Sequence, residues 1–454
     1  MIIHQKQTIS NKYLGKKTRS FLILIFSAVT LLGCAFHEKR MDTTTSILPQ
    51  HYIESSTSEG DASGTEYWAA LFADPELQRL ITQALNNNNE ILRAGAKSEQ
   101  LEQLEIIKKA PLLPFIALGG AAGSERQLNA AGAVNGGHQS FSLAASYEID
   151  LWNKLENSAD SASLITAASK EELQGLRTSI IARTTEFYYL IAELRNRISL
   201  HKTRIAILNQ YVKGIEIRYR QGITTPAELY QARKDLFNAQ AAYASLSGVL
   251  AEATHKLAVL LGNFPDNKLT SSPTKLPTLD TSFIADPPAK LLENRPDIRA
   301  SFLRLQARDR DIASAVAGRY PSFNLSGQLG MSRVDFGTVI SGNFWNLLLS
   351  ATQPLWDGNR IKARVAQSKA AYKEFLADYH HTVLVAFQEA EDGLSSIRTH
   401  RKRYSLLKEQ LANATQATVY TADLYRTGIA DSQAVDKSRL GKLEATEQLL
   451  MEKR

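Results

Sequence analysis

A long internal duplication constrains the fold of this chain more than any other sequence feature. Three motifs recur in the same order in both halves, about 206 residues apart. The first half holds PFIALGG, YEIDLW and RYRQGI, and the second half holds PSFNLSG, ATQPLW and LYRTGI. This shared order indicates that one structural unit is used twice, which suits a symmetric assembly better than a single buried active site. The anchor pairs are Pro114 and Pro321, Trp152 and Trp356, Tyr219 and Tyr425, and Gly222 and Gly428.

The first 33 residues have the pattern of a bacterial lipoprotein signal. Basic residues precede the apolar run Phe21–Leu32, and the segment ends in LLG before Cys34, the only cysteine of the chain. We therefore expect cleavage before Cys34 and attachment of lipid to it; an ordinary signal peptide with an incidental cysteine is the alternative. Five of the 53 Lys and Arg residues lie in this segment and no Asp or Glu does. The mature chain is thus almost neutral, and its charge requires no nucleic-acid partner.

Proline and small polar residues divide the rest of the chain. Residues 34–65 are rich in Ser, Thr and Gly and predict an extended tether behind the lipid. Five of the 13 prolines fall in residues 263–288, which predicts a linker because proline breaks helix interiors. The first repeat is accordingly expected to span residues 66–262 and the second repeat residues 289–454.

A very long helix is predicted from Trp152 to Gly222. Its apolar positions alternate steps of four and three residues, as in a coiled-coil seam. His201 is the one polar seam position, and we interpret it as a tolerated seam residue rather than a ligand. The seam positions are Phe187, Ile191, Leu194, Ile198, His201, Ile205, Leu208, Val212, Ile215 and Tyr219.

Each half is predicted to end in a helical hairpin. Gly222 ends the first helix, and Thr225, followed by proline and then by Glu228 three residues on, forms a capping box that starts the next helix. The second half turns at Gly428, with Asp431 or Ser432 as the candidate cap.

Short strands are predicted between the helices. Segments 140–150 and 322–332 alternate large apolar residues with small polar ones, as membrane β-barrel strands do. The partner segments are less regular, since 115–124 is rich in Gly and Ala and 343–353 is apolar on both faces. Four strands cannot close a barrel, and open strand edges do not persist in lipid, so several chains would have to share one barrel. Two hairpins of a soluble sheet are the alternative.

Motifs for enzyme chemistry are missing from the sequence. It contains no Gly-rich phosphate loop, no His-Glu-x-x-His and no Cys-x-x-Cys. The acidic residues Glu389, Glu391 and Asp392 lie on a long charged helix, where we expect them to be solvated. We predict that the protein is not an enzyme and uses no metal or cofactor.

Several segments resemble TolC-type outer-membrane efflux proteins, and with a lipidated cysteine the closest resemblance is to their NodT-like lipoprotein branch. The segment Leu291–Phe323 is similar to the family signature, most specifically in its run RPDIR. Trp68–Ile91 resembles the N-terminal half, and YEIDLWNKL and QPLWDGNR resemble the two strand-to-helix junctions. The resemblance covers roughly Trp68 to Arg454.

The resemblance implies a mainly α fold in which each repeat gives a strand pair and a long helical hairpin. It further implies a homotrimer with a 12-stranded β-barrel, four strands per chain, continued by a periplasmic α-helical barrel. The implied partners are outer-membrane lipid, a periplasmic adaptor (membrane-fusion) protein and an inner-membrane transporter of the resistance-nodulation-division type. The hairpin tips would contact the adaptor through Tyr219, Arg220, Gly222, Tyr425, Arg426 and Gly428.

Family members narrow the tunnel near the tips with rings of acidic side chains, and this sequence departs from that pattern. The usual acidic positions are Ala434 and Lys437 here, so Asp431 and Asp436 are the candidates for the pore constriction.

The predicted function is therefore an exit duct of a tripartite efflux pump in the outer membrane, passing drugs or small toxic compounds. Two alternatives stay open: the outer-membrane duct of a type I protein-secretion system, and a periplasmic coiled-coil lipoprotein without a pore.

Overall fold

The computed structural model describes residues 74–129, 132–265, 276, 294–335 and 339–454. This part of the chain forms two compact units. The strand unit comprises Leu104–Leu164 and Leu305–Leu376, and the helical unit comprises the described part of Thr44–Gln103 together with Ile165–Arg304 and Ala377–Arg454. The predicted signal segment, Cys34, the tether and most of the linker at 263–288 lie outside the described residues.

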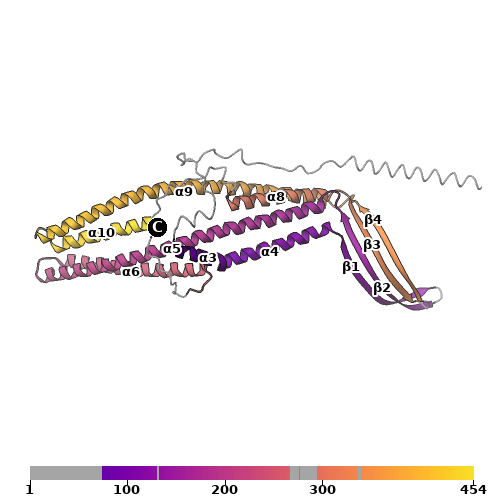
Figure 1. Cartoon of the computed structure of the whole chain (residues 1–454), viewed down its shortest axis with the longest axis horizontal. Helices are drawn as coiled ribbons and strands as arrows, with labels where there is room; N and C mark the ends of the chain where they lie inside the picture. The colour runs from indigo at the N-terminus through magenta and orange to yellow at the C-terminus, as the bar shows by residue number, and fades with distance from the viewer. Residues whose placement is uncertain (1–73, 130–131, 266–275, 277–293, 336–338) are drawn as a thin grey trace, which may run out of the picture. The chain divides into compact units, whose positions relative to one another are not determined.

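The strand unit holds a four-stranded antiparallel sheet in the order β1-β2-β3-β4 (Figure 1). Its strands are β1 (Phe115–Asn129), β2 (Gly132–Ile149), β3 (Ser322–Asp335) and β4 (Val339–Thr352). The central pairing joins the two halves of the sequence, with Ile149 of β2 opposite Phe323 of β3. β1 and β4 are the edges, and in the described part of the chain each of them pairs on one side only.

The helices repeat between the two halves. The longest ones, α5 (Lys154–Arg220) and α9 (Arg360–Arg426), have 67 residues each. Each turns back into a shorter helix, which is α6 (Pro226–Leu260, 35 residues) in the first hairpin and α10 (Ser432–Lys453, 22 residues) in the second. The remaining elements are α3 (Pro75–Asn87), α4 (Asn89–Lys109), the 3-10 turn η2 (Ala110–Leu112) and α8 (Pro296–Ala317). The predicted fold class, a duplicated strand pair plus long helical hairpin, is confirmed.

The core of the helical unit follows the predicted seam. Leu208, Val212 and Ile215 of α5 are buried against Leu229 and Leu236 of α6. A second cluster joins α3, α5 and the end of α6, and it includes Leu77, Ile180, Leu194 and Leu257. The prediction was wrong at the last seam position, because Tyr219 is 43% exposed. The seam therefore ends at Ile215 and leaves the tip of the hairpin without a buried core.

No helix in the described ranges is long and apolar enough to cross a membrane.

Candidate functional site

One face of the sheet is covered with exposed apolar side chains. The strand pairing places Leu143 opposite Leu329, Phe141 opposite Met331, and Leu329 opposite Trp345, so these side chains share a face. Each of them is about half exposed or more, and Trp345 is 77% exposed. A continuous exposed apolar face of this size predicts contact with lipid rather than water. Its large side chains are Ile116, Leu118, Phe141, Leu143, Leu329, Met331, Trp345, Leu347 and Leu349.

The opposite face of the sheet is small and polar over the two central strands. Ser140, Ser142, Ser326 and Gln328 lie on it, and the Gln328 side chain donates a hydrogen bond to Ser142 Oγ over 2.9 Å. A sheet with one apolar and one polar face is what separates lipid from an aqueous lumen in a transmembrane barrel.

The strand-to-helix junction of the first half is fixed by a tryptophan. The ring of Trp152 stacks on Tyr320 with 4.9 Å between ring centroids, and its Nε1 donates to the Pro321 carbonyl over 2.8 Å. Asp150 then accepts a hydrogen bond from the Glu156 amide in the first turn of α5, over 2.8 Å. These contacts hold the end of β2 against the start of β3 while the chain turns into the long helix.

Both hairpin tips are built in the same way. Gly222 has φ of 73° and Gly428 has φ of 78°, a left-handed conformation in which other residues are strained. The amide of the residue after each glycine donates to the carbonyl five residues back: Ile223 to Arg218, and Ile429 to Leu424, each over 2.9 Å. This is the Schellman arrangement, which satisfies the last free carbonyls of a helix. The sequence prediction of two glycine-ended helices is thereby met.

The helices after the tips begin with the predicted caps. Thr225 accepts the Glu228 amide at 3.4 Å and precedes a proline in the first turn of α6. The Glu228 carboxylate in turn accepts the hydroxyl of Thr224, a contact that the sequence did not indicate. Of the two cap candidates in the second half, Asp431 is the one used, and it accepts the Ala434 amide at 2.9 Å.

The tip residues expected to meet an adaptor are exposed. Tyr219 and Tyr425 are 43% and 51% exposed, and the isoleucines that follow the two glycines, Ile223 and Ile429, are 60% and 75% exposed. Exposed apolar residues gathered at a chain turn mark a contact surface. The isoleucines were not singled out from the sequence, although both occur in the duplicated RYRQGI and LYRTGI motifs.

The candidate constriction residue Asp431 has two structural partners. Besides capping α10, its carboxylate accepts a hydrogen bond from Arg218 at the end of α5, with 3.1 Å between Nη1 and Oδ2. The two hairpin tips are therefore joined by an ion pair within the helical unit. Asp431 is still half exposed, at 53% for its side chain.

The other candidate, Asp436, is less accessible. Its side chain is 14% exposed and lies 3.7 Å from Arg439 on the same helix. Burial raises the pKa of Asp436, and the nearby Arg439 only partly offsets this effect. A carboxylate in this setting is a weaker candidate for a ring of charge in an open tunnel than Asp431 is.

A buried charged cluster joins α5 to α10. Glu447 accepts hydrogen bonds from Arg197 at 3.0 Å and from His201 Nε2 at 3.1 Å, and Arg204 lies 3.9 Å away. Burial by itself would raise the pKa of Glu447, but the hydrogen bonds from His201 and Arg197 outweigh it and lower the pKa. His201 is thus a partner of Glu447, and its polar place in an apolar seam was the only sequence signal for the cluster.

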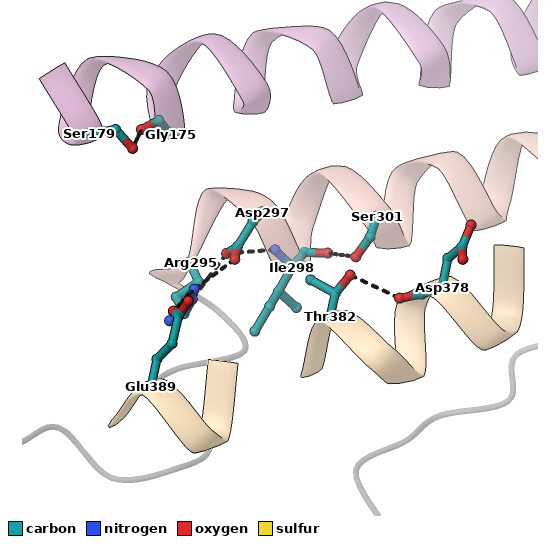
Figure 2. A network of polar contacts seen from close by, with 9 residues as sticks. All are labelled: Gly175, Ser179, Arg295, Asp297, Ile298, Ser301, Asp378, Thr382 and Glu389. Carbon is teal, nitrogen blue, oxygen red and sulfur yellow. Dashed lines mark hydrogen bonds and ion pairs between the residues drawn. The ribbon is translucent and has the colours of Figure 1, made fainter. Parts of the chain in front are cut away.

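The RPDIR run starts α8 and fixes it to a neighbouring helix (Figure 2). Arg295 binds Asp297 with two hydrogen bonds, of 3.0 and 2.7 Å, and binds Glu389 of α9 with one of 2.6 Å. Asp297 also accepts the Ile298 amide. Burial would raise the pKa of Asp297, but Arg295 lowers it.

A second ion pair links the same end of α8 to α5, because Arg299 pairs with Glu171 at 2.7 Å. We expected Glu389 to be only solvated, but its carboxylate accepts a hydrogen bond from Arg295 and so links α9 to the start of α8.

The family model for outer membrane efflux proteins matches residues 80–263 and 288–453. The chain belongs to the outer membrane efflux protein family. Its duplicated strand pairs and long hairpins are thereby assigned to an efflux channel of the outer membrane, and the resemblance inferred from RPDIR and the two junctions is confirmed.

The outer-membrane efflux protein is similar to several known outer-membrane proteins over most of its length. It is 27% identical to the pyoverdine export outer membrane protein OpmQ of Pseudomonas putida, over 90% of this chain and 88% of that protein. It is 24% identical to the probable outer membrane lipoprotein SilC of Salmonella typhimurium, over 95% and 94% of the two chains. The crystal structure of the CmeC outer membrane channel of Campylobacter jejuni shares the fold, with a TM-score of 0.81, 21% identity and 92% of each chain covered.

Proposed function

We propose that this outer-membrane efflux protein is the exit duct of a tripartite pump and works as a homotrimer. The observation that carries the proposal is the sheet with one exposed apolar face, one polar face and two open edges. Open edges in lipid are costly because their backbone groups have no partners, so the sheet has to be completed by other copies of the chain. Three copies give a closed barrel of twelve strands.

The helical hairpins would continue the duct across the periplasm. Their tips carry exposed tyrosine and isoleucine side chains in both halves, which suits contact with a periplasmic adaptor. We assign this contact to Tyr219, Arg220 and Gly222 in the first tip and to Tyr425, Arg426 and Gly428 in the second. An inner-membrane transporter of the resistance-nodulation-division type would load the duct.

Relatives support efflux of small molecules rather than secretion of proteins. One of them is named for pyoverdine export, and another is named antibiotic efflux pump outer membrane protein ArpC, of Pseudomonas putida, 26% identical over 91% of this chain. We propose that the cargo of this channel is likewise a small compound. By analogy with the lipoprotein SilC, we propose that Cys34 carries the lipid anchor and that residues 1–33 are removed.

Substitutions at the tips test the proposal. The double variant Tyr219→Ala and Tyr425→Ala leaves the strands and the buried seam unchanged, so the channel should still assemble in the outer membrane. It should fail to restore ethidium efflux to cells that lack the native channel. Lys402→Ala, at an exposed position of α9, is the control and should restore efflux fully. Normal efflux by the double variant would contradict the assignment of the tips to the adaptor.

A further inference from the structure

The apolar face of the sheet ends in a polar row before the loops. The strand pairing places Gln139 of β2, Arg333 of β3 and Ser341 of β4 side by side on this face. The row before it, toward the helices, contains Phe141 and Met331, which are 53% and 59% exposed. Apolar and polar side chains thus meet along one line across the sheet, as they do where the hydrocarbon core of a membrane ends.

A furrow of about 860 Å³ runs between these two rows and crosses all four strands. Three consecutive residues of each strand line it. The middle residue of each three points to the other face of the sheet, so the backbone forms the floor and the two rows of side chains form the walls. On β4 the walls are Asn343 and Ser341, whereas on β1 they are only Gly120 and Ala122. The furrow is therefore widest toward β1.

The position of the furrow along the strands places it at the edge of the hydrocarbon core. The apolar band begins at Ile149, and Gln139 lies ten residues further along β2. At the usual rise and tilt of barrel strands, ten residues span about 26 Å across the membrane, and the apolar band of such a barrel is about 25 Å tall. The polar row is therefore level with lipid headgroups. Because the helices of this channel family extend into the periplasm, these headgroups belong to the outer leaflet.

The polar row presents a cation without an anion. Arg333 is exposed and makes no ion pair with any residue whose side chain the structure describes. Within the same described side chains, Gln139 and Ser341 have no hydrogen-bond partner. Neighbouring strands hold such side chains about 5 Å apart, so the three present their donors to one place. A guanidinium flanked by an amide and a hydroxyl suits an anion with several oxygens, and phosphate is the anion that arginine binds through two parallel hydrogen bonds.

We propose that the furrow binds the phosphorylated headgroup of a lipid of the outer leaflet, with its phosphate on Arg333. Gln139 and Ser341 donate hydrogen bonds to the same phosphate from the adjacent strands. Phe141 and Met331, on the other wall, contact the first methylene groups of the acyl chains. The furrow lies on the outward face of the sheet, so completion of the barrel by other copies leaves it open to lipid. Lipid binding here depends neither on the cargo of the duct nor on its pump partners.

The next residue of β3 on this face, Asp335, provides a competing explanation for Arg333. Asp335 is opposite Val339, one step nearer the loop. If Arg333 served only as the partner of this carboxylate, substitution of either residue would leave lipid binding unchanged. As a phosphate ligand, Arg333 is required for binding. Asp335→Asn should then strengthen binding, because a nearby negative charge repels the phosphate.

Native mass spectrometry of the detergent-purified channel, titrated with bis-phosphorylated lipid A, measures the binding. We expect one lipid for each chain of the wild-type protein. Arg333→Ala should bind lipid A about tenfold more weakly, because it loses charge-assisted hydrogen bonds to the phosphate. Arg333→Lys keeps the charge without the fork of two donors and should bind with intermediate affinity. Arg333 is exposed, so both variants should keep the wild-type melting temperature.

Arg126 provides the matched control. It is an exposed arginine on the same face of the sheet, on β1 opposite Asn135, and it does not line the furrow. Arg126→Ala should leave the binding of lipid A nearly unchanged. An equal loss for Arg126→Ala and Arg333→Ala would mean that lipid A responds to surface charge alone, and would refute a site in the furrow.

Two further ligands separate the phosphate from the rest of the lipid. Lipid A without phosphate groups should bind the wild-type channel as weakly as phosphorylated lipid A binds Arg333→Ala. Excess inorganic phosphate should not displace lipid A, because Phe141 and Met331 also hold its acyl chains. Equal binding of phosphorylated and dephosphorylated lipid A, or complete displacement by inorganic phosphate, would overturn the proposal.

Discussion

At the scale of single residues, buried charge distinguishes two carboxylates of α10. Asp436 has one arginine near it and a raised pKa, whereas Glu447 has two arginines and a histidine near it and a lowered pKa. This difference in pKa follows from the charged partners of the two residues, because burial alone would raise the pKa of both carboxyl groups. Sequence spacing could show that both residues lie on one helix. It could not show that Arg197, His201 and Arg204 of α5 come to Glu447, because the contact spans some 250 residues of chain.

We predict that Asp436→Asn raises the melting temperature of the assembled protein at pH 7. A carboxyl whose pKa is raised in the folded state favours folding only while it is protonated, so its charged form costs stability above that pKa. The gain should vanish near pH 3, where wild-type Asp436 is protonated. Calorimetry at the two pH values measures the effect, with Asp235→Asn at an exposed site of α6 as the control. A lower melting temperature at pH 7 would show that the pairing with Arg439 outweighs burial.

We predict the opposite sign for Glu447→Gln. A carboxyl with a lowered pKa contributes stability above its unfolded pKa, and this contribution is lost as the pH falls through the folded value. The substitution also removes the carboxylate that accepts hydrogen bonds from His201 and Arg197, of which only Arg197 keeps another anion, Glu193 at 3.2 Å. This loss should cost about 1–3 kcal/mol at pH 7. The deficit should shrink in acid. Glu444→Gln, at an exposed site of the same helix, should be neutral, and equal melting temperatures of both variants would refute the role of the cluster.

At the scale of elements, the sequence predicted most of what the structure contains. Glycine positions located both tips, and the heptad pattern located the buried side of α5 up to Ile215, since these features are local. The RPDIR run was recognised only as a family signature. Its physical role depends on Glu389 of α9, a residue far along the chain that sequence spacing could not place beside Arg295.

We predict that Arg295→Lys destabilises the start of α8. The guanidinium of Arg295 binds Asp297 through two nitrogens, and one of these also binds Glu389. Lysine has a single ammonium group and cannot make all of these contacts in the same geometry. The loss should be about 1–2 kcal/mol in unfolding free energy. Arg299→Lys keeps a single contact with Glu171 and should cost less. Denaturant unfolding of the two variants gives the comparison, and a larger loss for Arg299→Lys would be inconsistent with the network.

We predict that joining the two tips blocks export. Arg218 and Asp431 connect the end of α5 to the start of α10 by an ion pair. We propose that the second hairpin, α9 and α10, moves when the duct opens, and such a movement would separate the two residues. Cysteines at both positions, bridged by a reducible bis-maleimide, should stop ethidium efflux until a reductant is added. Each single-cysteine variant treated with the same reagent is the control. Undiminished efflux through the bridged channel would mean that this hairpin does not move.

At the scale of the whole molecule, the duplication has a direct consequence for assembly. Each half supplies two strands and one hairpin, and the halves join through β2 and β3 within the chain. The opposite edges, β1 and β4, have no second neighbour in the described part of the chain, and in the proposed trimer they pair with other copies. The sequence predicted that several chains must share one barrel, because four strands cannot close. It could not show that Trp152 stacks on Tyr320 whereas Trp356 is exposed, since both tryptophans lie in similar motifs.

The most direct test of the central claim is single-channel conductance of the detergent-purified protein in planar lipid bilayers, with the mass of the same sample measured in parallel. We predict a stable trimer that forms a pore of low conductance, which follows from our proposals that three chains close one barrel and that the duct is narrowest near the hairpin tips. A protein that leaves the membrane without detergent once its lipid is removed, and that gives no conductance, would contradict the account and favour a coiled-coil lipoprotein without a pore.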